Sequence, residues 1–273
     1  MKNILVPTDF SSSANNAAIY AAALAKELNA KIILLHSFHV PIPPSDIPVT
    51  AISVEELQKN NERFLAREVS RIHRHYDVKV EVSTRAGFAV DEIHDLEKEK
   101  KPDLIIMGMK GAGKVQEVLI GSTAISVIRT AKTPVLLIPE TSAFVKPKKI
   151  ILACDYKAGM NLDNLSFLKM VAGKLNSEIF LVNVVLDKES IPAAEKGVEG
   201  MGIAQYMGNI KCSSHFPLNK DFISGIDDFL NKQEVEMITI IPQKHNLLER
   251  LFSESHTKRM AFHSEIPLLT LPS

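Results

Sequence analysis

The feature that most constrains the fold is an internal repeat, because one pattern of apolar segments occurs twice in the 273 residues. KNILVPTDF (2–10) recurs as KKIILACDY (148–156), LAKELNAKIILLH (24–36) as VAGKLNSEIFLVN (171–183), and TPVLLIP (133–139) as IPLLTLP (266–272). The offset between copies falls from 147 to 133 positions, so the second copy is the shorter one. We therefore predict two tandem domains, residues 1–141 and 147–273. The short link between them is no flexible tether, so they should pack together.

Strand and helix patterns alternate within the first copy in the order βαβαβαβαβ. Short apolar runs at 4–7, 31–36, 104–107 and 135–138 are typical of buried strands, and the alternating run 78–82 of a half-exposed one. Helix starts are indicated at Ser11 or Ser12, at the capping box Ser53-x-x-Glu56, near Val90 and at Ser122. This order predicts an α/β fold with a doubly wound, five-stranded parallel sheet in each copy.

A glycine-spaced loop lies between two of these buried strands. Gly108, Gly111, Gly113 and Gly121 precede Ser122, which stands where a helix N-cap is expected. Glycine lets the backbone approach an anion closely and adopt positive φ, and the free N–H groups of a helix's first turn point toward the charge. The loop therefore predicts a nucleotide phosphate site.

Two familiar phosphate motifs nearly fit this loop, but both fail. A P-loop requires Ser or Thr where this chain has Val115, and the dinucleotide motif G-x-G-x-x-G requires glycine where it has Gln116. The spacing that does fit is Gly108-x2-Gly111-x9-Gly121-Ser122.

Ligands of open parallel sheets bind outside the carboxyl ends of the strands, where the strand order reverses. Three loops should meet there, namely 7–9, 37–39 and the glycine loop. Asp9 can accept hydrogen bonds from a ribose hydroxyl or a base amino group, or simply favour the following helix N-terminus, and the spacing leaves both open. The backbone of Ser37 can pair with a base edge, and Ser122 can donate to phosphates.

Composition excludes several other functions. The 32 acidic residues balance 32 Lys and Arg, Trp is absent, and aromatics make up only 6%, so neither a nucleic-acid footprint nor a base-stacking platform is expected. No apolar run approaches the length of a membrane span, and the N-terminal apolar run is too short for a signal peptide. The two cysteines fit a reducing compartment. We expect a cytoplasmic protein that binds neither nucleic acid nor membrane.

The glycine spacing, the VPTD strand, the LLH strand and the TPVLLIP ending together resemble the universal stress protein family, over essentially the whole chain. The resemblance implies a fold like that of the adenine-nucleotide alpha-hydrolases and binding of ATP, with any Mg²⁺ held by the phosphates. It also implies that strands 135–138 and 268–271 pair, as in the family's homodimer, into an intramolecular pseudo-dimer; a further homodimer stays open. By position, the implied ligand residues are Pro7, Thr8, Asp9, Ser37, Met107, Gly108, Gly111, Gly121, Ser122 and Thr123.

The second copy departs from the glycine signature. At the offset of 133, Gly108, Gly111 and Gly121 correspond to Ile241, Lys244 and Glu254. Ser122 is matched by Ser255, and Asp155 matches Asp9. Because side chains replace bare backbone and one carries negative charge, the second copy should not bind ATP in this way. We expect one ATP per chain.

The sequence offers no catalytic group and no metal-ligand cluster. Nine histidines are scattered, and Phe10-Ser11-Ser12-Ser13 lacks the glycine with which related ATP pyrophosphatases grip pyrophosphate. Three hypotheses follow. The first is an ATP-binding regulatory protein of the stress response that acts on an unknown protein partner. The second is a slow ATPase or nucleotidyl-transferring enzyme, and the third an interaction module whose pocket binds no nucleotide.

Overall fold

The structure, a computed structural model, describes residues 1–39, 54–111, 120–153, 162–187, 198–241 and 265–272. They fall into two compact units, Met1–Thr133 and Pro134–Ser273. The strand at 135–138, which the repeat assigns to the first copy, thus lies in the second unit. The domain boundaries inferred from the repeat, 1–141 and 147–273, stay a prediction.

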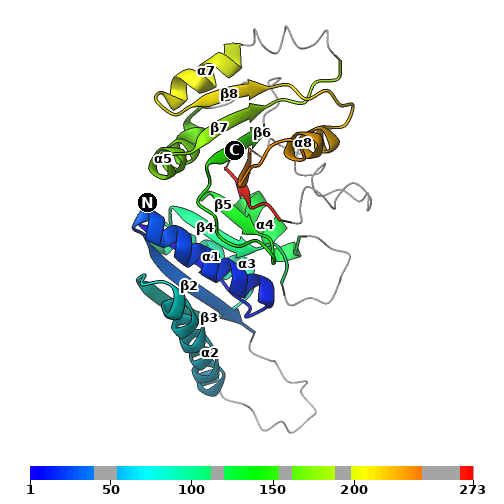
Figure 1. The fold of residues 1–273 in the computed structure, drawn as a ribbon. Helices are drawn as coiled ribbons and strands as arrows, with labels where there is room; N and C mark the ends of the chain where they lie inside the picture. The colour runs from blue at the N-terminus through cyan, green and yellow to red at the C-terminus, as the bar shows by residue number, and fades with distance from the viewer. Residues whose placement is uncertain (40–53, 112–119, 154–161, 188–197, 242–264, 273) are drawn as a thin grey trace. The chain divides into compact units, whose positions relative to one another are not determined.

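The first unit alternates four strands with four helices in its described ranges (Figure 1). In chain order these are β1 (Asn3–Pro7), α1 (Ser12–Leu28), β2 (Lys31–Phe38), α2 (Val54–His75), β3 (Val80–Ala86), α3 (Ala89–Lys100), β4 (Leu104–Gly108) and α4 (Ser122–Thr130). β1 pairs with both β2 and β4, and β2 pairs with β3, all in parallel. The order β3-β2-β1-β4 confirms the predicted doubly wound α/β fold.

The point at which this strand order reverses lies between β1 and β4. From β1 the chain moves outward through β2 to β3 and then returns to β4 on the other side of β1. With right-handed crossovers, α1 and α2 cover one face of the sheet and α3 covers the other. The helix contacts agree, because α1 packs with α2 and α3 packs with α4. Such a reversal opens a crevice at the carboxyl ends of β1 and β4.

Helix α1 brings its start close to this crevice. The Ser11 side chain accepts a hydrogen bond from the Ala14 N–H and so caps the helix, and the left-handed Asn29 ends it at φ 52°. Ala17, Ala21, Leu24 and Leu28 recur at helical spacing, which predicts one apolar face, and all four are buried. Small alanine side chains let the helix backbone lie close to the strands beneath it.

Two local predictions were wrong in detail. The third strand spans Val80–Ala86, not 78–82. The N-cap of α4 is Gly121 in an extended conformation, and Ser122 is the first helical residue. Sequence pattern favoured serine as the cap, but the cap position falls on Gly121, whose N–H donates to the carbonyl oxygen of Met109, the residue after β4, at 2.7 Å. Ser53 and Gly113 lie outside the described residues.

The second unit repeats this topology. Its elements are β5 (Val135–Ile138), β6 (Lys149–Ala153), a short 3-10 helix (Leu162–Leu165), α5 (Ser166–Leu175), β7 (Glu178–Val182), α7 (Val198–Met207), β8 (Cys212–His215), α8 (Phe222–Leu230), β9 (Met237–Ile240) and β10 (Leu268–Thr270). β6 pairs in parallel with β7 and β9, β7 with β8, and β9 with β10.

The predicted pairing of the two last strands is confirmed. β10 runs antiparallel to β5, with Leu269 opposite Leu136 and Thr270 opposite Val135, and the Thr270 hydroxyl donates to the Val135 carbonyl oxygen at 3.2 Å. The second unit therefore has six strands in its described residues, and β5 supplies the sixth.

Candidate functional site

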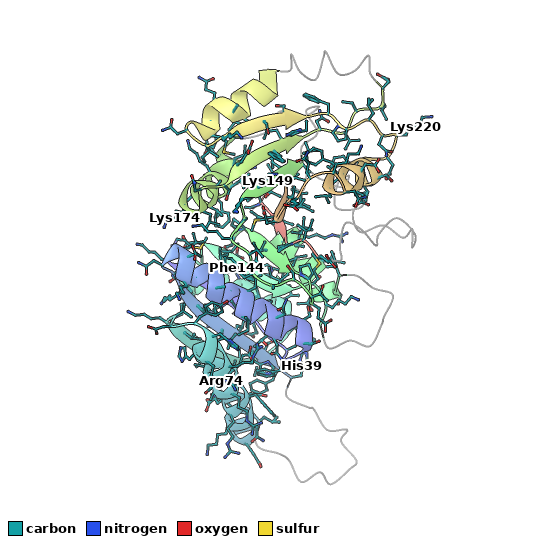
Figure 2. The ribbon with its side chains drawn as sticks, viewed as in Figure 1. His39, Arg74, Phe144, Lys149, Lys174 and Lys220 are labelled. Atoms are coloured by element: carbon teal, nitrogen blue, oxygen red, sulfur yellow. The ribbon has the colours of Figure 1, made fainter. Side chains whose placement is uncertain are left out.

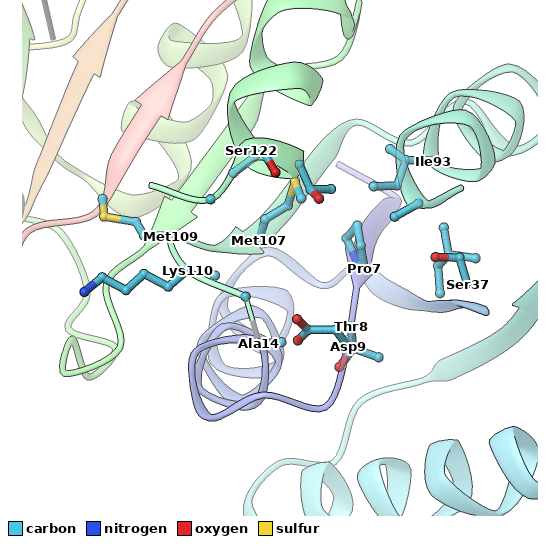
Figure 3. A pocket seen from close by; sticks show the side chains of 17 residues that line it. Pro7, Thr8, Asp9, Ala14, Ser37, Ile93, Met107, Met109, Lys110 and Ser122 are labelled. Carbon is cyan, nitrogen blue, oxygen red and sulfur yellow. The ribbon is translucent and has the colours of Figure 1, made fainter. Parts of the chain in front are cut away.

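A cavity of about 520 Å³ lies in the first unit at the carboxyl ends of β1, β2 and β4. Side chains of 17 residues line it (Figure 3). All ten residues proposed from the sequence are among them, namely Pro7, Thr8, Asp9, Ser37, Met107, Gly108, Gly111, Gly121, Ser122 and Thr123. The structure thus brings these residues together, and their role as nucleotide ligands stays a prediction.

The loop after β1 forms one wall of the cavity. Thr8 is buried and donates its N–H to the Leu35 carbonyl oxygen at 2.8 Å, while its hydroxyl oxygen accepts the Phe10 N–H at 3.1 Å. The Asp9 carboxylate accepts the Ser11 N–H at 3.0 Å. Asp9 therefore lines the cavity and also supports the start of α1, so the two interpretations left open by the sequence are compatible.

The glycine loop forms another wall, and neighbouring atoms lie too close to two of its glycines, Gly108 and Gly111, for a side chain to fit without a shift. A Cβ on Gly108 would lie 2.5 Å from the Ser13 hydroxyl oxygen and 2.7 Å from the Ser13 carbonyl carbon. A Cβ on Gly111 would lie 2.9 Å from an Asp9 carboxylate oxygen, whereas one on Gly121 would meet nothing nearer than 3.6 Å. Among the glycines of the described ranges, only Gly208 has positive φ. The expectation that this loop needs left-handed glycine is therefore wrong for Gly108, Gly111 and Gly121.

The N-terminus of α4 forms part of the cavity wall. Gly121 caps the helix without a side-chain hydrogen bond, and the following residues Ser122, Thr123 and Ala124 all line the cavity. The N–H groups of a first turn carry partial positive charge and lack partners within the helix. Together with the exposed Ser122 hydroxyl, they form a binding surface for an anion.

Part of the cavity wall is apolar, and sequence reasoning missed most of it. Leu35 on β2 and Ala89 and Ile93 on α3 belong to this part. Figure 3 shows Ile93 and Ser37 on one side, whereas Lys110 extends from the glycine loop on the other. The burial of Ile93 was foreseeable from its helical spacing, but nothing local in the sequence indicates that α3 borders the crevice. Lys110 was also missed, although it stands inside the glycine signature.

Charge is sparse around this cavity. Of the described residues that line it, only Asp9 and Lys110 carry a formal charge. The Lys110 backbone is held in place, because its N–H donates to the buried Ser13 hydroxyl at 3.3 Å. The described ranges contain no group of three or more His, Cys, Asp or Glu side chains placed to hold a metal ion.

Fold and cavity together define a doubly wound α/β protein with a cavity at its switch point, lined by a helix N-terminus and by apolar side chains. Comparison with known proteins takes this further. The model of the universal stress protein family matches residues 1–139. The chain belongs to the universal stress protein family.

Individual relatives agree with this assignment. A universal stress protein of Methanocaldococcus jannaschii is 31% identical over 150 residues, which cover 54% of this chain and 84% of that protein. A second universal stress protein from the same organism is 30% identical over 152 residues, which cover 50% of this chain and 94% of that protein. The crystal structure of a universal stress protein from Archaeoglobus fulgidus covers 98% of this chain and 97% of its own with a TM-score of 0.72. At 19% identity, that structure supports the fold over both units.

None of the helices within the described ranges combines the length and apolar character that a membrane crossing requires.

Proposed function

We propose that the first unit binds ATP, with Mg²⁺ held by the phosphates, and that the bound nucleotide regulates a stress-response interaction with a protein partner. The observation that carries this proposal is the composition of the cavity wall, which combines apolar side chains with a helix N-terminus that has no side-chain cap. Its volume of about 520 Å³ is within the range of small-molecule sites.

Each part of the nucleotide has a matching part of the cavity. The base would lie against Ile93 and Leu35, near the backbone of Ser37. The ribose would lie by Asp9, whose carboxylate can accept hydrogen bonds from hydroxyl groups. The phosphates would lie at the start of α4, where backbone N–H groups and the Ser122 hydroxyl can donate to them, with Lys110 beyond.

The same mode of binding is not proposed for the second unit. Ile241 follows β9 where Gly108 ends β4, and its side chain is buried. In the first unit this position tolerates no side chain, because Ser13 lies too close to it. Asp155, Lys244, Glu254 and Ser255 lie outside the described residues, so the sequence alone supports the rest of the contrast.

Equilibrium dialysis with MgATP tests the proposal directly, and we expect one ATP per chain. Zero or two would contradict it. A thermal unfolding scan gives an independent check, since a ligand at 100 times its dissociation constant adds about 2.7 kcal/mol of stability to the folded state.

A single substitution can locate the bound nucleotide. Gly121→Glu introduces the residue found in the second copy, and its Cβ fits without a clash, so the fold should survive. We expect ATP binding to be lost, because a carboxylate would stand where the phosphates bind. Gly173→Glu on α5, where an added Cβ meets nothing within 4 Å, is the matched control and should bind ATP normally.

The same pair of variants separates regulation from catalysis. Enzymes typically turn over about 1 to 1,000 times per second. A regulatory ligand site should hydrolyse ATP far more slowly, and Gly121→Glu should remove whatever hydrolysis this site supports. Turnover within the enzymatic range that disappears in Gly121→Glu but persists in Gly173→Glu would favour an enzyme over a regulator.

A further inference from the structure

Phe10 has an unusual backbone conformation beside the cavity. Its φ is 62°, in the left-handed region that bulky side chains rarely adopt. The other non-glycine residues with positive φ in the described ranges, Asn29, Lys101 and Asn176, are helix C-caps, where this conformation is common. Phe10 instead stands between β1 and α1, and a strained residue at such a place persists only where its surroundings impose it.

Two aromatic side chains pack against Phe10. Its ring centroid lies 4.4 Å from that of His36 on β2 and 5.6 Å from that of Phe64 on α2. The polar groups of its backbone are also used. Its N–H donates to the Thr8 hydroxyl, and its carbonyl oxygen accepts from the Asn15 side-chain amide at 3.2 Å. Packing and hydrogen bonds therefore hold Phe10 from both sides.

His36 links this cluster to the cavity wall. Its Nδ1 lies 2.8 Å from the Thr8 carbonyl oxygen. A carbonyl oxygen can only accept, so Nδ1 carries the proton and donates it to this bond. One imidazole ring thus packs against Phe10, tilted by 38°, and anchors the backbone of Thr8, the residue before Asp9.

Asp9 lies between these two anchored residues. Its carboxylate accepts the Ser11 N–H, and one carboxylate oxygen lies beside Gly111 across the cavity. We propose that Phe10, held left-handed by the His36 ring, is a positioning residue that fixes the Asp9 carboxylate to read the ribose hydroxyls of the nucleotide. The inference rests on the proposed function, since it needs a nucleotide in this cavity.

The choice of residue supports this role. Glycine would adopt a φ of 62° without strain, but it would have no ring to pack against His36 and would leave the loop free to take other conformations. An aromatic residue strains the backbone, but its packed ring holds the loop in one conformation. The Asp9 carboxylate on this loop is then held in one orientation, which favours binding to two hydroxyl groups at once.

The test compares ATP with 2′,3′-dideoxy-ATP, which lacks the ribose hydroxyls, by titration calorimetry well below the unfolding temperature. We expect the wild-type protein to prefer ATP by roughly tenfold or more, as hydrogen bonds to a charged acceptor allow. Phe10→Gly should reduce this preference to within roughly threefold while the affinity for the dideoxy analogue stays unchanged. Phe10→Tyr, which keeps the ring, should retain the preference.

Asn29→Gly is the matched control. It places glycine at a left-handed position at the far end of α1, and it should leave both affinities unchanged. Should Phe10→Gly fail to fold, His36→Leu and His36→Asn replace it. Leucine removes the donor to Thr8 and should lower the preference for ATP, whereas asparagine can still donate and should restore part of it.

Each outcome decides between the two claims. A wild-type protein that binds neither nucleotide overturns the proposed function and this inference with it. Equal binding of both nucleotides leaves the function standing and overturns the inference. The inference also fails if Phe10→Gly keeps the preference for ATP, or if it weakens both nucleotides equally, since the residue would then serve stability alone.

Discussion

The two units resemble each other at the amino ends of their strands and differ at the carboxyl ends. At the amino ends, both units use a carboxylate that accepts two backbone N–H groups. In the first unit, the Asp103 carboxylate accepts the N–H groups of Lys2 and Asn3 at 2.6 and 2.9 Å. In the second, the Glu236 carboxylate accepts those of Lys148 and Lys149 at 3.2 and 2.8 Å. Asp103 directly precedes β4 and binds the start of the neighbouring β1, and Glu236 directly precedes β9 and binds the start of the neighbouring β6.

At the carboxyl ends, the units have diverged. Gly108 ends β4 with bare backbone against Ser13, whereas buried Ile241 follows β9. His36, which anchors the cavity wall in the first unit, corresponds to Asn183 in the second. The comparison shows that the two units keep the same carboxylate contacts at the amino ends of their strands, while the residues at the carboxyl ends differ.

The largest expected effect comes from making the first unit resemble the second. Gly108→Ile would place side-chain atoms on the Ser13 hydroxyl and backbone, so we expect a loss of roughly 1–3 kcal/mol in stability from overpacking and no measurable ATP binding. Chemical denaturation and dialysis measure the two effects. Gly173→Ile is the control at an open position. Wild-type ATP affinity in Gly108→Ile would show that this glycine does not distinguish the two units.

The amino-end device should affect stability alone. Asp103→Ala removes the acceptor of two N–H groups, and we expect a loss of about 1–3 kcal/mol with ATP affinity unchanged. Glu236→Ala should cause a similar loss of stability through the second unit. Asp103→Asn keeps one acceptor oxygen and should cause a smaller loss. Urea unfolding curves measure the change. A clear fall in ATP affinity in Asp103→Ala would contradict the separation of scaffold and site.

A carboxylate in the second unit gives that unit its own pH dependence. Burial, with the charges of Asp228 and Asp221 adding to it, raises the pKa of Asp227 from 3.8 to about 6. The folded state therefore binds the proton more tightly, and its stability should fall as the pH rises from about 4 through about 6. Asp227→Asn should remove this fall and raise the free energy of unfolding by about 1 kcal/mol at pH 7. The gain is smaller than the full pKa shift implies, because solvent screens the charge of a half-exposed group.

The measurement is thermal unfolding of both proteins between pH 3.5 and 8, a range chosen to span about two units around the raised pKa. The two curves should coincide below about pH 4 and separate above it. Parallel curves over the whole range would show that Asp227 does not titrate in this way. ATP affinity, which we propose for the first unit, should be unaffected.

The smallest expected effect concerns Lys110, which the second unit replaces with Gln243 at the offset of 133. Lys110→Ala should weaken ATP by up to roughly fivefold, as expected for a partly exposed charge pair, and leave AMP nearly unchanged. The control is Lys26→Ala at the exposed far end of α1. Equal weakening of ATP and AMP would indicate that Lys110 supports the loop and does not contact the outer phosphates.

Much of the architecture could be read from the chain because it depends on local patterns. The strands β1, β2 and β4 and the buried face of α1 follow from apolar periodicity, and the repeat places their counterparts in the second unit. The meeting of three loops at one cavity was also predictable, since loops that follow parallel strands lie at one edge of a sheet, whereas the ten candidate site residues on these loops were implied by the family resemblance.

Tertiary structure alone decided the features that depend on contacts between distant segments. The apolar wall at Ile93, the left-handed Phe10 against His36 and the closeness of Gly108 to Ser13 all join residues far apart in the chain, and no local pattern reports such distances. The sequence by itself therefore determined two α/β repeats with the glycine signature in the first. Packing decided which side chains wall the cavity and how firmly its carboxylate is held, because burial and strain are properties of the assembled fold.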